Sequence, residues 1–161
     1  MVALKGEEMS ISICIIAHNE EENLPRTLAS LAWADEIVLV DCERTDGTVE
    51  RAREYTDIIF HRPNLPDLNV NKNYSFDRAK SDWILCLDAD EVVSPSLARE
   101  IGEVIGEGGP ESGFFLKREN NWFGRVLRHG GHFPDLQLRL FRRERGRFPE
   151  RHVHERLSLD G

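Results

Sequence analysis

Short apolar runs alternate with helix-like segments over the first 105 residues, and this alternation constrains the fold more than any other feature of the sequence. The apolar runs are predicted to be strands, at 11–16, 36–40, 58–60 and 83–87. Capping residues, prolines and apolar stripes predict helices over about 21–33, 45–55, 70–79 and 95–105. Because strands connected through helices run parallel, the sequence predicts an α/β fold with a mostly parallel sheet and helices on both faces.

The pattern changes after the glycine-rich stretch at 106–113. Two further strands are expected at 114–116 and 136–141, and the second alternates apolar with polar residues as a half-exposed strand does. An aromatic, glycine-bearing loop is expected between them, at 120–134. The second part of the chain is therefore predicted to be rich in strand.

The length of 161 residues is that of one domain. We expect a single domain over 1–161, with an α/β half at 10–105 and a smaller β-rich half at 113–157. No stretch approaches the roughly 20 apolar residues of a membrane span, and no secretory signal is recognisable. The three cysteines form no C-x-x-C pair and are expected to be reduced, buried and inert, as in a cytoplasmic protein.

Charge is divided unevenly along the chain, whose formal net charge is −8. Residues 1–116 hold 23 acidic and 10 basic residues, whereas residues 117–161 hold 6 acidic and 11 basic residues. The acidic part argues against a nucleic-acid partner. The basic part is either an ordinary solvated surface or a surface for an anionic partner, such as a phosphate-bearing substrate or an anionic membrane.

Polar clusters follow three of the predicted strands at the points where those strands end. The clusters are His18-Asn19-Glu20, Asp41 and Asp88-Ala89-Asp90. In an open α/β sheet, ligands bind beyond the carboxyl ends of the strands, where the strand order reverses. The sequence therefore predicts a ligand site at this edge of the sheet.

Asp88 and Asp90 are carboxylates spaced i, i+2 directly after a buried run. Such hard oxygen ligands suit Mg²⁺ or Mn²⁺, with phosphate oxygens completing the coordination shell. A solvated acidic turn is the structural alternative for this pair. Asp41 is a candidate for contact with a base or ribose, while Thr45 or Asp46 is expected to cap the following helix.

The glycine-rich loops that often cradle phosphates are absent, since the sequence holds neither G-x-x-x-x-G-K-[ST] nor G-x-G-x-x-G. Phosphate charge would then be balanced by a metal ion and by basic side chains. Lys72 is one candidate, and the group of Arg139, Arg142 and Arg143 is another. Each is equally compatible with an ordinary surface cation.

Several short motifs occur together in a fixed order. They are A-H-N-E at 17–20, V-D-x-x-x-T-D-G-T at 40–48, K-N at 72–73 and L-D-A-D-E at 87–91. In this order and spacing they resemble family 2 glycosyltransferases, whose GT-A fold is Rossmann-like. The segments F-P-D-L-Q-L-R-L-F-R-R at 133–143 and V-H-E-R at 153–156 resemble the branch near lipopolysaccharide core glycosyltransferases. The resemblance covers roughly residues 10–157.

The resemblance implies roles for the matching residues. The nucleotide side of the site would be lined by Ala17, Asn19, Glu20, Asp41 and Lys72. Asp41 would contact the base, and Ala17, Asn19 and Glu20 would form a uridine pocket.

The resemblance further implies a divalent metal ion, Mg²⁺ or Mn²⁺, held by Asp88 and Asp90. Asp88 would also belong to the donor site, and Asp90 would be the ligand closer to the diphosphate. His154 matches a histidine that would complete the metal shell or the diphosphate site. Asp135 occupies the place where such enzymes present a carboxylate that activates the acceptor hydroxyl.

The implied activity is transfer of a sugar, with inversion, from a nucleotide-diphosphate donor to a hydroxyl of a cell-envelope glycan or glycolipid. A UDP-sugar is the favoured donor, and peripheral association with the cytoplasmic membrane face is compatible with the basic part of the chain. The metal ion would stabilise the leaving diphosphate, and a carboxylate base would take the hydroxyl proton. Asp135 is the expected base, with Glu119 and Glu91 as the next candidates and an ordinary turn residue as the structural alternative.

Two features depart from the pattern of this family. Cys42-Glu43-Arg44 stands where a pair of small residues usually follows the second-strand aspartate, which leaves the nucleotide identity open. Members of this branch usually continue well past V-H-E-R, so the chain is expected to be truncated at its C-terminus. Two rival classes remain: a non-catalytic nucleotide-sugar-binding module, and a sugar-phosphate nucleotidyltransferase, which the acidic loop after the first strand disfavours.

Overall fold

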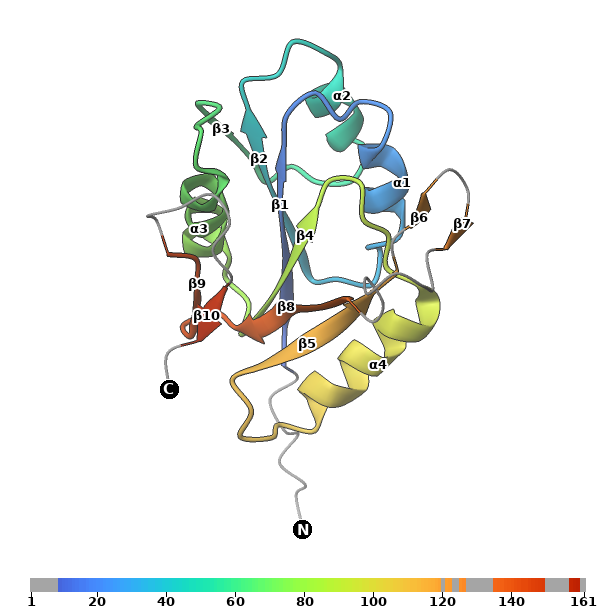
Figure 1. Cartoon of the computed structure of the whole chain (residues 1–161), viewed down its shortest axis with the longest axis vertical. Helices are drawn as coiled ribbons and strands as arrows, with labels where there is room; N and C mark the ends of the chain where they lie inside the picture. The colour runs from blue at the N-terminus through green and yellow to red at the C-terminus, as the bar shows by residue number, and fades with distance from the viewer. Residues whose placement is uncertain (1–8, 120, 123–124, 127–134, 150–156, 160–161) are drawn as a thin grey trace.

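The structure is a computed structural model that describes residues 9–119, 121–122, 125–126, 135–149 and 157–159. The strands of its main sheet are β1 (Ile11–Ala17), β2 (Glu36–Cys42), β3 (Ile59–Arg62), β4 (Trp83–Asp88), β5 (Gly113–Arg118) and β8 (Asp135–Arg142). The helices are α1 (Leu24–Ala29), α2 (Thr48–Ala52), α3 (Leu68–Arg78) and α4 (Pro95–Gly106). The sheet has the order β3-β2-β1-β4-β8-β5 (Figure 1).

The sheet is parallel from β3 to β4, as predicted, and β1 lies at its centre. Ile13 of β1 lies opposite Ile37 of β2 on one side and opposite Leu85 of β4 on the other. β8 runs antiparallel to β4, and β5 runs antiparallel to β8. Because the chain passes from β1 to β2 on one side and places β4 on the other, the strand order reverses between β1 and β4. The carboxyl ends of β1, β2 and β4 therefore meet at one edge.

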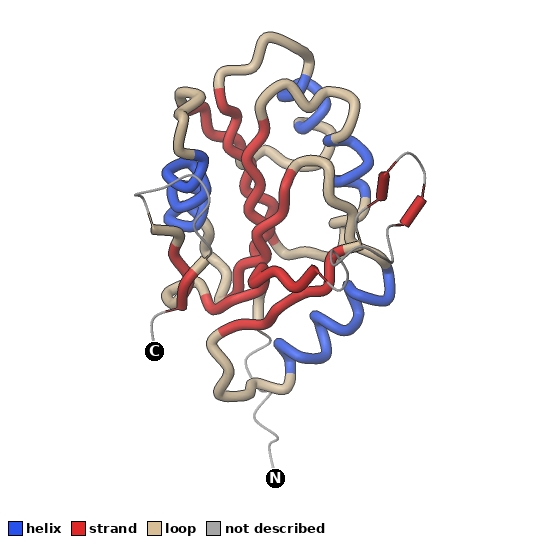
Figure 2. The backbone as a smooth tube through the Cα atoms, in the orientation of Figure 1, coloured by secondary structure: helices blue, strands red, loops and turns tan. Residues whose placement is uncertain are grey.

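Apolar side chains pack on both faces of the sheet, with helices on each. One core includes Leu28, Ala52 and Ile101 of α1, α2 and α4. The other core includes Phe76 of α3 and Ala79 just beyond that helix. Figure 2 shows α3 on one side of the sheet and α1 and α4 on the other. The predicted α/β fold with helices on both faces is confirmed.

The helix predicted over about 21–33 is shorter in the structure, where α1 has six residues. Ser30 follows the helix, and its Oγ donates to the carbonyl oxygen of Thr27 at 2.6 Å. Such a local bond from a serine side chain to the backbone competes with continued helix. The apolar stripe of the sequence therefore extended beyond the residues that are helical.

The helix predicted over about 45–55 is α2, with five residues, and its N-cap is Gly47. The expectation that Thr45 or Asp46 occupies the cap position is therefore wrong. The Gly47 N–H donates to the Glu21 carboxylate at 3.0 Å, so a residue from the β1–α1 loop fixes the helix start. Asp46 nevertheless accepts a bond from the Thr48 N–H at 3.0 Å, and so it satisfies a donor of the first turn.

The second part of the chain is rich in strand, as predicted, and β5 and β8 are longer than the runs that predicted them. Within the region predicted as a loop at 120–134, β6 (Asn121–Trp122) and β7 (Arg125–Val126) form an antiparallel pair. Two-residue strands are too short to give a period of two in the sequence, which explains why they were not predicted. Another pair forms between β9 (Gly146–Arg147) and β10 (Ser158–Leu159).

The sequence also predicts that the three cysteines are buried and reduced. Cys14, Cys42 and Cys86 are all buried and free of disulfides, as predicted. Burial raises the pKa of each thiol, which makes the thiolate scarce and the side chains unreactive.

Within the described ranges, no helix combines the length and the apolar character that crossing a membrane requires.

Candidate active site

The predicted polar clusters meet at the carboxyl edge of the parallel strands. In register, Ala17 at the end of β1 lies opposite Asp41 of β2. On the other side of β1, Ile16 lies opposite Asp88 of β4. The loops that follow β1, β2 and β4 lie together at one end of the molecule (Figure 1). Asp41 and Asp88 therefore flank the end of the central strand.

Asp88 is bonded to a cation at each of its carboxylate oxygens. Lys72 Nζ donates to Oδ1 at 2.9 Å, and Arg139 Nη2 donates to Oδ2 at 2.8 Å. Lys72 comes from α3 and Arg139 from β8, so three elements converge on this point. The ammonium of Lys72 also lies 5.4 Å from the centre of the Phe148 ring, a cation–π distance. The two basic residues therefore lie at the D-x-D motif.

Arg142 and Arg143, which the sequence groups with Arg139, lie elsewhere. The Arg142 guanidinium covers the Trp83 ring at 4.7 Å, and Arg143 Nε donates to the Ser81 carbonyl oxygen at 3.0 Å. Both contacts are at the amino end of β4, whereas Asp88 is at its carboxyl end. Of the three arginines, Arg139 is the one that the fold brings to the site.

The contacts continue from Asp88 to the β-rich half. Arg139 Nη2 also lies 3.0 Å from Glu91 Oε1, and Arg118 Nη1 lies 3.5 Å from the same oxygen. Arg118 then bonds Asp135 Oδ2 through Nη2 at 2.7 Å and through Nε at 2.9 Å. The other Glu91 oxygen accepts the backbone N–H of Asp88 at 2.9 Å. We call this set the ion network; its members are Lys72, Asp88, Glu91, Arg118, Asp135 and Arg139.

The surroundings shift the pKa values of three members of the ion network. Burial alone would raise the pKa of Asp88, but Lys72 and Arg139 outweigh it and hold this pKa well below its usual range. Burial alone would lower the pKa of Arg139, but the negative charge of Asp88 outweighs it and raises this pKa. For Glu91, burial outweighs the attraction of Arg139, and the pKa is raised. Asp88 is therefore anionic at neutral pH, and Glu91 takes up a proton more readily than an exposed glutamate.

The carboxylates at the end of β4 fit a divalent ion in their chemistry. Each Asp88 oxygen accepts one hydrogen bond from a cation, which leaves lone pairs on both oxygens. Asp90 is exposed and bonds to none of the described residues. Among the described residues, no three His, Cys, Asp or Glu side chains are grouped to hold a metal ion. His154, the predicted further ligand, lies outside the described residues.

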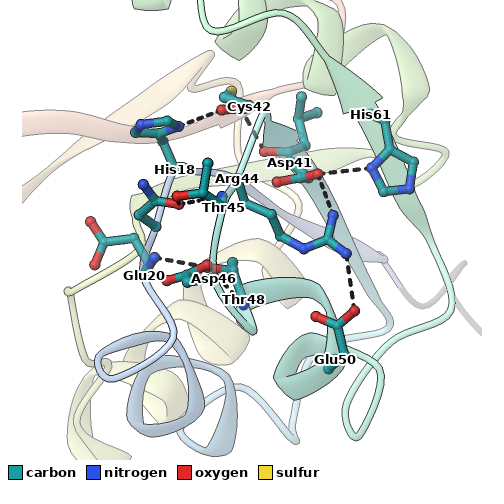
Figure 3. A network of polar contacts seen from close by, with 12 residues as sticks. His18, Glu20, Asp41, Cys42, Arg44, Thr45, Asp46, Thr48, Glu50 and His61 are labelled. Carbon is teal, nitrogen blue, oxygen red and sulfur yellow. Dashed lines mark hydrogen bonds and ion pairs between the residues drawn. The ribbon is translucent and has the colours of Figure 1, made fainter.

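Asp41 lies at the end of β2 and is 2% exposed. Its Oδ2 accepts from Arg44 Nη1 at 3.0 Å and lies 2.8 Å from His61 Nδ1 (Figure 3). Arg44 Nη2 in turn donates to Glu50 Oε1 at 3.1 Å. We call these four residues the Asp41 cluster. Asp41 Oδ1 and Arg44 Nε are buried and have no hydrogen-bond partner among the described residues.

Asn19 and Glu20 belong to the loop that follows β1, and Figure 3 shows Glu20 near Asp46 and Thr48 of the loop that follows β2. Asn19 has a positive φ of 55°, and its side-chain oxygen accepts from the Thr45 N–H at 2.7 Å. The backbone N–H of Glu20 donates to Thr48 Oγ1 at 2.8 Å. The β1 and β2 loops therefore hold each other in place. Ala17 is the last residue of β1 and lies opposite Asp41 in register.

The structure brings in residues that the sequence did not single out. His61 reaches Asp41 because β3 pairs with β2 and places the two residues opposite each other. Arg118 reaches Asp135 because β5 and β8 place them opposite each other, although they are 17 residues apart. Neither contact has a signal in the local sequence. Arg44 did have a signal in the sequence, because Cys42-Glu43-Arg44 stands where a pair of small residues usually follows the second-strand aspartate.

The sheet is parallel from β3 to β4, and polar residues gather at the strand ends on both sides of a reversal in strand order. This arrangement is typical of α/β domains that bind a ligand at that edge. Residues 12–157 match the family model described as Glycosyl transferase family 2. The chain therefore belongs to glycosyl transferase family 2.

Individual relatives and solved structures agree with this membership. The chain is 28% identical over 164 residues to the lipopolysaccharide core biosynthesis glycosyltransferase LpsC of Rhizobium meliloti, and covers 59% of it. It is 19% identical to S. aureus TarS in complex with UDP-GlcNAc, with a TM-score of 0.65 over 88% of this chain and 49% of that one. It is 18% identical to the mannosyltransferase PcManGT from Pyrobaculum calidifontis in complex with GDP-Man and Mn²⁺, with a TM-score of 0.64 over 89% and 48%. The likeness to the two structures shows the shared fold, and the chain spans less than two thirds of each of these proteins.

Proposed function

We propose that this chain is an inverting glycosyltransferase that moves a sugar from a nucleotide-diphosphate donor to a hydroxyl of a cell-envelope glycan or glycolipid. The observation that carries the proposal is Asp88, anionic between Lys72 and Arg139 at the carboxyl end of β4, with Asp90 exposed beside it. Membership of the family supports sugar transfer. The name of LpsC, a lipopolysaccharide core enzyme, supports an acceptor of the cell envelope.

In this proposal Asp88 and Asp90 hold a divalent ion, Mg²⁺ or Mn²⁺, together with oxygens of the donor diphosphate, and His154 is a further ligand. When bound, the ion acts as a Lewis acid that stabilises the charge of the departing diphosphate. Lys72 and Arg139 fix the orientation of the Asp88 carboxylate and add positive charge on the diphosphate side. The Mn²⁺ in the structure of the mannosyltransferase supports the choice of metal.

The nucleoside part of the donor is proposed to lie over the ends of β1 and β2. Ala17, Asn19, Glu20 and Asp41 would line it, since Ala17 and Asp41 lie near the ends of these strands and the loop after β1 carries Asn19 and Glu20. A UDP-sugar is the first donor to test and a GDP-sugar the second. TarS with UDP-GlcNAc and PcManGT with GDP-Man support these two choices.

Asp135 is the proposed base that takes the proton of the acceptor hydroxyl. Arg118 holds one of its oxygens, and Gln137 Nε2 donates to the other at 2.7 Å, so the carboxylate has a fixed orientation. Glu91, the next candidate, also has both oxygens bonded, one to Arg139 and the other to the backbone N–H of Asp88. Glu119 is exposed, and no described contact joins it to the ion network. The reaction is proposed to take place in the cytoplasm, with the basic second part of the chain supporting peripheral contact with the membrane.

A thermal-shift screen tests the donor site. The folded protein is heated with UDP-, GDP-, CDP- and dTDP-sugars, each with and without MnCl₂, because a ligand that binds the folded state raises Tm by mass action. We expect a Tm rise that depends on Mn²⁺ and is largest for one nucleotide. If none of these donors raises Tm with or without the metal, the proposed donor site is wrong.

The donor identified in this way then separates an enzyme from a binding module. Slow, metal-dependent hydrolysis of the nucleotide sugar without acceptor supports transferase activity. Saturable binding with no turnover supports the non-catalytic module instead.

A further inference from the structure

Strand β5 is the last strand of the main sheet, and its outer side pairs with no other strand among the described residues. Figure 1 shows β5 beyond β8, on the side of β8 away from β4. The Ser112 carbonyl oxygen accepts the Arg142 N–H at 2.9 Å, so the backbone groups of Ser112 face β8. Because backbone groups alternate in direction along an antiparallel strand, those of Gly113 and Phe115 face outward. β5 therefore offers N–H and C=O groups that a further strand can bond.

The side chains of β5 alternate between the two faces of the sheet. Phe114 packs against the core that α1, α2 and α4 share, so Phe115 points to the other face. On that face Phe115 is 63% exposed, and Leu136 of β8 is 55% exposed. Leu136 lies opposite Lys117, two residues from Phe115, so Phe115 and Leu136 are diagonal neighbours. We call the outer side of β5, together with Phe115 and Leu136, the β5 edge.

The charges along β5 favour pairing of this strand with itself. Glu111 precedes the strand and Lys117 lies near its end, and both side chains are exposed. If two copies of β5 run antiparallel with Phe114 opposite Phe114 of the second copy, Glu111 of each copy lies opposite Lys117 of the other. If Phe115 lies opposite Phe115 instead, Glu111 lies opposite Glu119, and like charges directly opposite each other are destabilising. Charge therefore favours the register centred on Phe114.

The same register also matches the sizes of the facing side chains. Phe115 then lies opposite Gly113 of the second copy, and an aromatic side chain that covers a glycine on a neighbouring strand stabilises a sheet. The two Phe115 rings become diagonal neighbours across the twofold axis, which is within reach of aromatic side chains. Burial of these rings would drive the association, while the exposed charge pairs would mainly set the register.

We infer that two copies of this chain associate through the β5 edge, with their β5 strands antiparallel and Glu111 of each copy opposite Lys117 of the other. A second copy is the partner that fits, because an interface across a twofold axis must be complementary to itself. One pair of strands makes a small interface, so the association is weak and reversible. It does not depend on the proposed sugar transfer, since Arg118 of the ion network lies on the opposite face of β5 from Phe115.

Sedimentation velocity of the whole chain over a range of concentrations tests this inference. We expect a reversible change from monomer to dimer as the concentration rises. Phe115→Asp should weaken the association at least about tenfold, because it replaces an apolar contact with two like charges. Leu68→Asp is the matched control, because Leu68 is 44% exposed at the start of α3; it should associate as the unmodified chain does. A chain that stays monomeric at every concentration, or a Phe115→Asp variant that associates normally, would overturn the inference.

Charge reversal tests the register. Glu111→Lys and Lys117→Glu should each associate about tenfold more weakly, because the twofold axis turns both charge pairs into like-charge pairs. An equimolar mixture of the two variants should regain the association, since each chain then offers the charge that the other lacks, and this recovery also shows that both variants fold. A mixture that stays as weakly associated as the single variants, or single variants that associate normally, would overturn the inference.

Discussion

Two aspartates lie near the carboxyl ends of the strands that flank β1, and their surroundings differ. Asp88 and Asp41 end the strands on either side of β1, and both follow buried apolar runs. Asp88 is bonded to a cation at each oxygen, and the charges continue through the ion network to Asp135. Asp41 has two partners on one oxygen and, among the described residues, none on the other. One carboxylate is thus satisfied by the fold, and the other is left partly unsatisfied.

This difference indicates what each region contributes to binding. The ion network balances its own charges, so the folded chain holds Asp88 and Asp135 in a fixed geometry before any ligand arrives. The Asp41 cluster has buried groups whose bonds are incomplete, so a ligand adds bonds that the fold does not supply. We therefore expect changes in the ion network to affect catalysis most strongly, and changes in the Asp41 cluster to affect donor affinity.

The largest effect is expected for Asp88→Asn. The change removes the negative charge that Lys72 and Arg139 share and weakens the proposed hold on the metal ion and the diphosphate. Because a bound divalent ion is worth several kcal/mol of transition-state stabilisation, transfer should fall by about a thousandfold. The measurement is kcat/KM for sugar transfer at saturating MnCl₂.

A matched control for this variant is Asp77→Asn, since Asp77 is an exposed residue of α3 paired with Arg147. It removes one carboxylate from the same region without touching the strand end, and transfer should stay near that of the unmodified chain. Near-normal transfer by Asp88→Asn would show that the end of β4 is not the reacting centre.

The next effect in size is expected for Asp135→Asn, at the other end of the ion network. An amide cannot take the acceptor proton, and general-base catalysis contributes about 10²–10⁴ in rate, so transfer should fall at least a hundredfold. The Kd for the donor should not change, because the proposed role of Asp135 is on the acceptor side. Glu119→Gln is the comparison, and a large loss of transfer in that variant with little loss in Asp135→Asn would move the base to Glu119.

The sequence predicts the places of Asp41 and Asp88 well, because strand ends depend on local patterns. A buried apolar run followed by an acidic residue marks the end of a strand, and parallel strands bring such ends together. The strand predictions at 11–16, 36–40 and 83–87 lie within the observed β1, β2 and β4. The same alternation predicts that these strands are parallel, so the meeting of their ends at one edge was visible in the sequence, whereas the strand order β3-β2-β1-β4 was not.

The bonding partners of these aspartates could not be predicted from the sequence, because they depend on contacts between segments far apart in the chain. Arg139 and Arg142 differ by three residues in the sequence, yet they lie towards opposite ends of β4. Which of them meets Asp88 depends on β8 running antiparallel to β4, and the local sequence holds no signal of that direction. His61 and Arg118 likewise reach their aspartates through strand register.

A smaller effect is expected for Asp41→Asn. The change replaces the proposed charge-assisted hydrogen bond to the base with a neutral one, so the preferred nucleotide should bind about tenfold more weakly. The rate at saturating donor should fall much less than the affinity, in contrast to Asp88→Asn. The measurement is Kd by titration together with kcat. A variant that loses kcat as severely as Asp88→Asn would remove the distinction between the two aspartates.

The smallest effect concerns how stability depends on pH within the ion network, where two carboxylates have opposite shifts. The pKa of Asp88 is lowered, so its contribution to stability is present above its ordinary pKa near 4 and is lost as the pH falls further. Burial raises the pKa of Glu91, so the folded chain binds this proton more tightly than the unfolded chain. Protonation of Glu91 therefore favours the folded state, and this gain appears as the pH falls from neutral towards about 4.5.

Glu91→Gln tests this sign, because glutamine has no proton to gain over the interval. The free energy of unfolding, measured by urea denaturation at several pH values, should shift in favour of the unmodified chain relative to Glu91→Gln as the pH falls from 7 to about 4.5. Below that range, protonation of Asp88 lowers the stability of both proteins alike, so the difference between them should level off. A difference that moves the other way with acidification would mean that Arg139 and Arg118 outweigh the burial of Glu91. The ion network would then favour the charged form of Glu91, as it does that of Asp88, and the contrast with the Asp41 cluster would be larger.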